Sequence, residues 1–182
     1  LLDIHTHEDL EAELDPGLPE VVRHGTTSVI VGNCSIGLAF GAQRNEHQDP
    51  IVDCFARVEN IPKSVLAKTA DKAVWSKPKE YLEHLDELPL SANMAPFLPH
   101  SMLRIEVMGL QDSINRQPTG TELLRMTGIL EEALEDGYMG MSTDGLPLHF
   151  LANEPNLEKR IPTQYASFAE YKALTDVLRK HD

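Results

Sequence analysis

The chain alternates short apolar runs with amphipathic stretches, and this order constrains its fold more than any other feature. The run at residues 26–32 (Thr-Thr-Ser-Val-Ile-Val-Gly) has the β-branched content of a buried strand. Residues 121–136 place apolar side chains at helical spacing and are followed by Gly137, a residue type that commonly ends helices. Strands are expected at residues 1–5, 26–32, 93–98 and 138–142, and helices at 19–24, 78–88, 121–136 and 167–180.

A strand followed by a helix, four times in succession, predicts an α/β fold of parallel strands with helices outside them. A doubly wound sheet and a (β/α)8 barrel both fit this order, and the pattern alone does not choose between them. The segment from residue 34 to about residue 78 shows no clear period. A connection of that length is typically functional or contains short helices.

Charge and cysteine content narrow the classes of function. The 182 residues include 16 basic and 29 acidic side chains, which gives a formal net charge of −13. Such a chain repels phosphate backbones and anionic lipids, so nucleic acid and membranes are poor partners. Two cysteines, Cys34 and Cys54, are too few for a disulfide framework, which favours a cytoplasmic location. The sequence opens with Leu1 inside an expected strand, so we expect the natural protein to begin earlier.

The His-Thr-His run at residues 5–7 is the sharpest chemical signal. Residues two apart on a strand point to the same face, with their backbones about 6.6 Å apart. His5 and His7 at the end of a first strand could therefore share one divalent cation, with zinc as the first choice. The alternative is a pair of surface histidines at a strand end, and the run alone does not separate the two. The acidic residues Glu8 and Asp9 follow directly and could contact the metal through water, although acidic loop residues are usually solvated.

Polar residues also follow the other three expected strands. Cys34 comes directly after the second strand, where a thiolate would be a strong zinc ligand. The alternative is a buried structural cysteine, which is the usual state of a free cysteine. Pro99-His100-Ser101 follows the third strand, and Met141-Ser142-Thr143-Asp144 the fourth. In barrels of this kind the chemistry lies at the carboxyl ends of the strands, where these residues are expected.

Taken together, these motifs resemble the D-aminoacylase (N-acyl-D-amino-acid deacylase) branch of the amidohydrolase superfamily. The likeness runs through nearly the whole chain and keeps its motifs in order. The matching stretches are Asp3-Ile4-His5-Thr6-His7, Arg23-His24-Gly25-Thr26-Thr27, Val31-Gly32-Asn33-Cys34, Pro99-His100-Ser101-Met102-Leu103-Arg104, Val107-Met108-Gly109 and Gly140-Met141-Ser142-Thr143.

The resemblance implies a (β/α)8 barrel, of which residues 1–182 form one domain containing about the first four βα units. It implies that the flanking β-domain and the second half of the barrel come from other segments. It implies zinc bound by His5 and His7, with Cys34 in the bridging position. The implied reaction is hydrolysis of the linear amide of an N-acyl-D-amino acid by metal-activated water, with a general acid/base aspartate beyond residue 182.

The remaining roles that follow from the resemblance are weaker. His100 is expected beside the metal ligands as a positioning group. Ser142, Thr143 and His149 are expected to contact a small N-acyl amino acid or related amide. Relatives that act on D-amino acids carry a tyrosine after the Ser-Thr pair, and residues 144–150 contain none, which leaves the substrate's identity open.

Three ligands without their partners make a poor zinc site. We therefore expect this chain alone to be inactive and to bind metal weakly or not at all. Two alternatives stay open. One is a cyclic-amide hydrolase such as a dihydropyrimidinase. The other is a non-catalytic half-barrel that pairs with a second copy to cover its open sheet edges.

Overall fold

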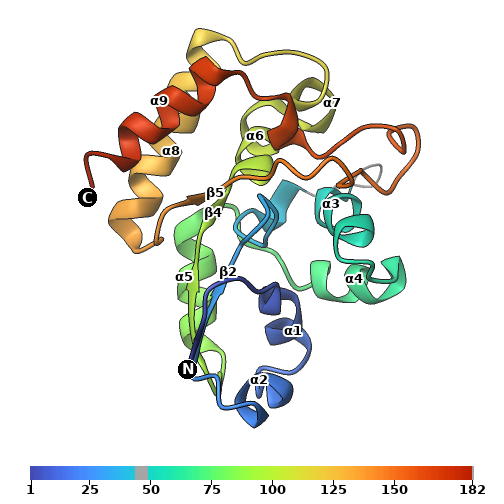
Figure 1. Cartoon of the computed structure of the whole chain (residues 1–182), viewed down its shortest axis with the longest axis vertical. Coiled ribbons are helices and arrows are strands. Elements are labelled where there is room, and N and C mark those ends of the chain that lie inside the picture. Colours follow the sequence, from blue (N-terminus) through green and yellow to red (C-terminus); the bar gives the residue numbers. More distant parts are fainter. Residues whose placement is uncertain (44–48, 182) are drawn as a thin grey trace.

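The computed structural model describes residues 1–43 and 49–181 and shows an α/β arrangement of parallel strands (Figure 1). Five short strands are present in this part of the chain. Every pairing between them is parallel. The strands are β1 (Leu2–Asp3), β2 (Ser28–Val31), β3 (Asn93–Pro96), β4 (Leu98–Pro99) and β5 (Met141–Ser142).

The strands follow one another in space in the order of the sequence. β2 lies between β1 and β3, and β4 pairs with β5. Phe97 separates β3 from β4, so the single third strand expected at residues 93–98 is split. The Phe97 amide donates to Val31 O (2.9 Å), and the Leu98 amide donates to Gly140 O (2.9 Å). The third strand region therefore changes its hydrogen-bonding partner at Phe97, from β2 on the β3 side to β5 on the β4 side.

The four expected helices are present, with ends that differ by a few residues from the prediction. They are α2 (Pro19–Arg23), α5 (Pro78–Glu87), α8 (Gly120–Asp136) and α9 (Phe168–Leu178). Proline begins α2 and α5, where its missing N–H costs no hydrogen bond. The Thr119 side chain caps α8, and the Ser167 side chain caps α9.

The other helices were not predicted individually. The segment from residue 34 to about residue 78, which shows no clear period in sequence, contains short helices, one of the two outcomes predicted for it. The His100-Ser101 pair, expected in a strand-end loop, instead forms the first turn of a helix. These elements are α1 (Glu8–Leu14), η1 (Gly41–Gln43), α3 (Pro50–Val58), α4 (Lys63–Ala70), α6 (His100–Met108), α7 (Leu110–Ser113) and η2 (Pro162–Tyr165).

Helix α6 occupies the centre of the main core. Met102 and Leu103 are completely buried, and α6 contacts α7, α8, η2 and β4. A second, smaller cluster lies beside β2 and includes Leu18, Val29 and Val31. None of the helices in the described ranges is both long and apolar enough to span a membrane.

Gly32 ends β2 in a conformation that other residues rarely adopt. Its φ is +72°, and an added Cβ would overlap the Phe97 carbonyl oxygen. Gly25 has a similar φ of +82° but has nothing within 4 Å of an added Cβ. Substitutions at the two glycines therefore share the backbone strain, and only the substitution at Gly32 adds a steric overlap.

We predict that Gly32→Ala lowers the free energy of unfolding clearly more than Gly25→Ala does. A left-handed conformation costs roughly 1–2 kcal/mol for a non-glycine residue, and only Gly32→Ala adds an overlap with backbone. Urea unfolding followed by circular dichroism measures both variants. Equal losses would contradict the close approach of Gly32 to Phe97.

Candidate metal centre

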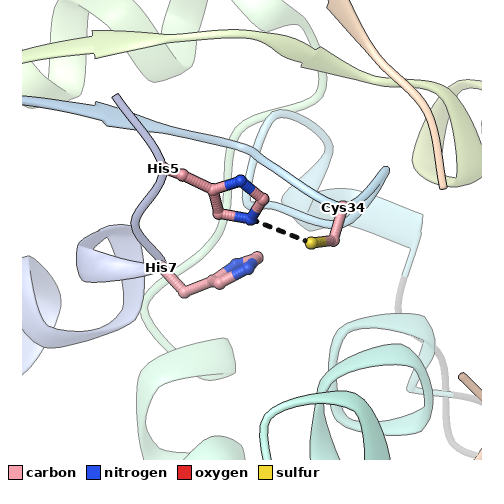
Figure 2. Close-up of side chains that lie close together, drawn as sticks. All are labelled: His5, His7 and Cys34. Atoms are coloured by element: carbon pink, nitrogen blue, oxygen red, sulfur yellow. Dashed lines mark hydrogen bonds between the residues drawn. The ribbon is translucent and has the colours of Figure 1, made fainter. Parts of the chain in front are cut away.

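Three side chains from two neighbouring strand ends converge at one point. His5 and His7 lie in the connection from β1 to α1, and Cys34 follows β2. One ligand atom from each residue lies within 4.8 Å of the other two. His5 Nε2 is 3.2 Å from Cys34 Sγ, and Figure 2 shows both imidazoles directed toward the thiol. The geometry thus brings two nitrogen donors and one sulfur donor together.

The reason for this convergence differs from the one the sequence suggested. The first strand was expected to extend to residue 5, with both histidines near its end on one face. β1 instead ends at Asp3, so His5 and His7 project from a bend and not from a strand. Thr6 anchors this bend, because its amide (3.1 Å) and its hydroxyl (2.9 Å) both donate to Ile30 O.

Cys34 lies in a turn with an unusual backbone. The φ angles of Cys34 and Ser35 are +50° and +66°, and both are non-glycine residues. Each such residue raises the free energy of the folded state by roughly 1–2 kcal/mol, which surrounding bonds must offset. The Asn33 side chain supplies part of this support, donating to Ile30 O (2.8 Å) and to Thr6 O (3.2 Å). The same amide therefore ties the histidine bend to the cysteine turn.

The surroundings of His7 favour a neutral imidazole. Burial, together with repulsion from His5 and His149, lowers the pKa of His7 to about 4. Its Nε2 lies 3.2 Å from Glu59 Oε1, and its Nδ1 is buried with no hydrogen-bond partner in the described part of the chain. A neutral imidazole with an unpartnered nitrogen has the form that binds metal.

The Cys34 thiol is half-buried. Burial, with added repulsion from Asp144 and Glu59, raises the pKa of this thiol to about 11. Thiolate is the form that binds metal, and coordination would deprotonate the thiol outright. Two imidazoles and a thiol are a donor set suited to zinc. The residues present therefore fit the metal that the resemblance implies.

A cavity of 480 Å³ opens beside these ligands. Its lining includes His5, His7 and Glu59, together with the apolar side chains of Leu10 and Leu66. A larger cavity of 570 Å³ lies between α5 and α8 and includes none of the three converging residues. We assign the site to the smaller cavity, because convergent polar groups define a binding site better than volume does.

The remaining predicted site residues differ in their exposure and in their contacts. His149 Nδ1 lies 3.0 Å from Asp144 Oδ1 but has no hydrogen-bond partner among the described residues. Ser142 is buried, and its hydroxyl bonds to the backbone of the cysteine turn. Thr143 is exposed. Substrate binding by Ser142, Thr143 and His149 stays a prediction.

His100 is completely buried and makes two hydrogen bonds through its ring. Nε2 lies 2.9 Å from Glu170 Oε1, and Nδ1 lies 2.9 Å from Thr163 Oγ1. Burial, with repulsion from Arg104, lowers the pKa of His100 despite the nearby carboxylate. The ring is therefore neutral, so Nε2 donates to Glu170 and Nδ1 accepts from Thr163.

Sequence reasoning missed one acidic group beside the site, Glu59 at the end of α3, because acidic residues at helix ends are usually solvated. Asp144 belongs to the polar run expected after the fourth strand. Asp9 was expected to be solvated but is 1% exposed, with neither carboxylate oxygen hydrogen-bonded within the described residues. Burial raises the pKa of Asp9 to about 7.

No protein-family model matches the chain, but individual proteins do. An uncharacterized protein of Mycobacterium tuberculosis is 40% identical over 181 residues, which are 98% of this chain and 29% of that protein. The N-acyl-D-aspartate deacylase of Alcaligenes xylosoxydans xylosoxydans is 31% identical over 143 residues, 78% of this chain and 25% of the enzyme.

Solved structures agree with these sequence matches. An N-acyl-D-glutamate deacylase from Bordetella bronchiseptica, in complex with zinc and a phosphonate inhibitor, superposes with a TM-score of 0.70 at 26% identity. The match covers 98% of this chain and 31% of that enzyme. This chain is a homologue of the D-aminoacylases. A D-aminoacylase with a binuclear metal centre superposes with a TM-score of 0.66 at 26% identity.

The D-aminoacylase relationship settles the choice of fold that the pattern left open. The predicted α/β class, a partial (β/α)8 barrel with parallel strands, is confirmed. This D-aminoacylase homologue spans about 30% of the length of the relatives it matches.

We predict that iodoacetamide modifies Cys34 in the native chain and leaves Cys54 unmodified. Cys34 is half-buried, whereas Cys54 is completely buried in α3. Thiolate is the reactive form, and the thiolate fraction below the pKa grows about tenfold per pH unit. With a pKa of about 11, the rate at Cys34 rises steadily from pH 8 to pH 10. Peptide mass spectrometry after timed labelling measures this rate. A plateau near the ordinary thiol pKa of about 8.5 would contradict the burial effect.

Proposed function

We propose that this chain supplies the first metal ligands of a zinc-dependent amidohydrolase that cleaves N-acyl-D-amino acids into a D-amino acid and a carboxylate. One observation carries the proposal, the convergence of His5, His7 and Cys34 on one point beside a cavity. The relatives named as deacylases support the same class of reaction.

His5, His7 and Cys34 would hold the metal. A divalent cation at such a site polarises a carbonyl oxygen as a Lewis acid and lowers the pKa of bound water. The chain prepares this site by keeping His7 neutral through burial. It also holds Cys34 beside His5 through the turn that follows β2.

Hydrolysis breaks the amide C–N bond and places the oxygen of water on the acyl carbon. The leaving nitrogen takes up a proton, which requires a general acid/base. We expect a carboxylate beyond residue 182 to fill this role. The electrostatic influence of Asp144 on Cys34, and of His149 on His7, supports a place for their loop near the site. We propose that His149, with Ser142 and Thr143, contacts the amide substrate.

The open edge of the sheet supports the expected domain organisation. Leu2 in β1 is 60% exposed, and Leu1 and Ile4 on either side of this strand are 78% and 65% exposed. Parallel strands are normally covered on both faces, and an apolar edge invites pairing. We propose that the second half of a barrel and a flanking β-domain cover this edge in the whole protein. Pairing with a second copy remains the alternative for the isolated chain.

We predict that the chain binds one Cd²⁺, a thiophilic stand-in for zinc, with a sulfur-to-metal charge-transfer band. Cys34→Ala abolishes the band, and His5→Ala and His7→Ala each weaken binding, because each removes one of three ligands. Binding is expected to be weak, so the titration extends to millimolar metal.

The matched controls are His24→Ala, an exposed imidazole paired with Glu20, and Cys54→Ala, a buried thiol. Neither is expected to change the band. A band that survives in Cys34→Ala, or that disappears in Cys54→Ala, would refute the assignment of the ligands.

We predict that the zinc-loaded whole protein carrying this chain hydrolyses N-acetyl-D-amino acids, and that the 182-residue chain alone does not. The chain alone is inactive because the expected general acid/base lies outside it. Release of free amine from N-acetyl-D-glutamate, N-acetyl-D-aspartate and their L-enantiomers measures both samples. Turnover by the chain alone, or an L preference in the whole protein, would contradict this proposal.

A further inference from the structure

We propose that three buried serines, Ser35, Ser101 and Ser142, form a clamp that fixes the Cys34 thiol beside the two histidines, with Ser142 as the positioning residue. The serine clamp rests on the metal site proposed above and concerns how that site is held. It assigns the Ser142 hydroxyl a positioning role at the backbone of the cysteine turn.

The turn needs an external support because its own backbone does not favour its shape. Gly32, Cys34 and Ser35 all have positive φ angles, between +50° and +72°. Only Gly32 is a residue type that adopts this region without strain. Within residues 32–35, relaxation of the two strained residues would move the Cys34 side chain. The position of the thiol therefore depends on bonds made from outside the turn.

The Ser142 hydroxyl bonds to both ends of the turn. It accepts a hydrogen bond from the Ser35 amide at 3.1 Å and donates one to the Gly32 carbonyl oxygen. Cys34 lies between these two attachment points. One side chain from β5 thus closes the turn across the thiol-bearing residue, although it is more than 100 positions away in sequence.

Ser101, at the start of α6, holds the far side of the turn. The Ser35 hydroxyl donates to Ser101 Oγ (2.9 Å) and accepts from the Ser101 amide (2.6 Å). The Ser101 amide is also 3.1 Å from Ser35 O. Ser35 and Ser101 are completely buried, and Ser142 is 9% exposed, so water replaces these bonds poorly.

A buried charged group anchors the clamp in turn. The Thr163 amide donates to Ser101 Oγ (3.1 Å), and the Thr163 hydroxyl bonds to His100. His100 and Arg104, both on α6, bond to the two oxygens of Glu170. These three side chains are at most 1% exposed. The Cys34 turn is thereby connected to α6, η2 and α9 through buried hydrogen bonds.

The test uses the Cd²⁺ band of the chain. We expect Ser142→Ala to weaken Cd²⁺ binding about 10- to 100-fold, the usual effect of losing a group that orients a ligand. Ser142→Thr keeps a hydroxyl at the same place and should restore binding. Ser113→Ala is the matched control, because Ser113 is also completely buried and donates to a carbonyl, Leu110 O, outside the clamp.

Two further measurements separate positioning from loss of fold. Protection of Cys54 from alkylation shows that the core of each variant is intact, and urea unfolding compares the stability of Ser142→Ala with that of Ser113→Ala. If Ser142→Ala binds Cd²⁺ as tightly as the wild type, or if Ser113→Ala weakens binding equally, the clamp is overturned. If the wild type itself shows no band, the proposed metal site fails first, so the two failures are distinguishable.

Discussion

The turn that follows β2 is the constraint on which the rest of the site depends. Its backbone bends at Gly32, where φ is +72°, and still leaves the Cys34 thiol 3.2 Å from His5 Nε2. The close approach of Gly32 to Phe97 brings β3 and β4 against the turn. Ser142 then draws β5 to the same point. The parallel strands thus meet where the candidate ligands meet.

Burial gives the site a consistent electrostatic character in the metal-free chain. It lowers the pKa of His7 to about 4 and raises the pKa values of Cys34 to about 11 and of Asp9 to about 7. Each change favours the neutral form, as expected where charges lose their hydration. A divalent cation would reverse this preference for the thiol. The neutral imidazole of His7 is the form that binds a cation, and the negative net charge of the chain also favours one.

A second group of buried polar side chains, His100, Arg104 and Glu170, supports the site, and its carboxylate stays charged. Burial alone would raise the pKa of Glu170, but hydrogen bonds from His100 and Arg104 outweigh burial and lower it. Removing one partner of a buried ion pair typically costs about 3–5 kcal/mol, whereas a well-packed apolar replacement of the whole group is often tolerated. We infer that this group matters mainly because it fixes the position of α6 relative to α9, next to the serine clamp, and less because it adds to the free energy of unfolding.

The sequence by itself determined the order of strands and helices and the identity of the three converging residues. Local patterns suffice for the strands and helices, because β-branched runs and helical spacing act over a few residues. The three residues as a set came from the resemblance to a known family. Only the tertiary structure decided that β1 stops before His5, that α6 begins at His100, and that Glu59 and Asp144 approach the thiol. Those outcomes depend on contacts between residues far apart in the chain. Burial and hydrogen bonds such as Ser142 to Ser35 leave no local trace in the sequence.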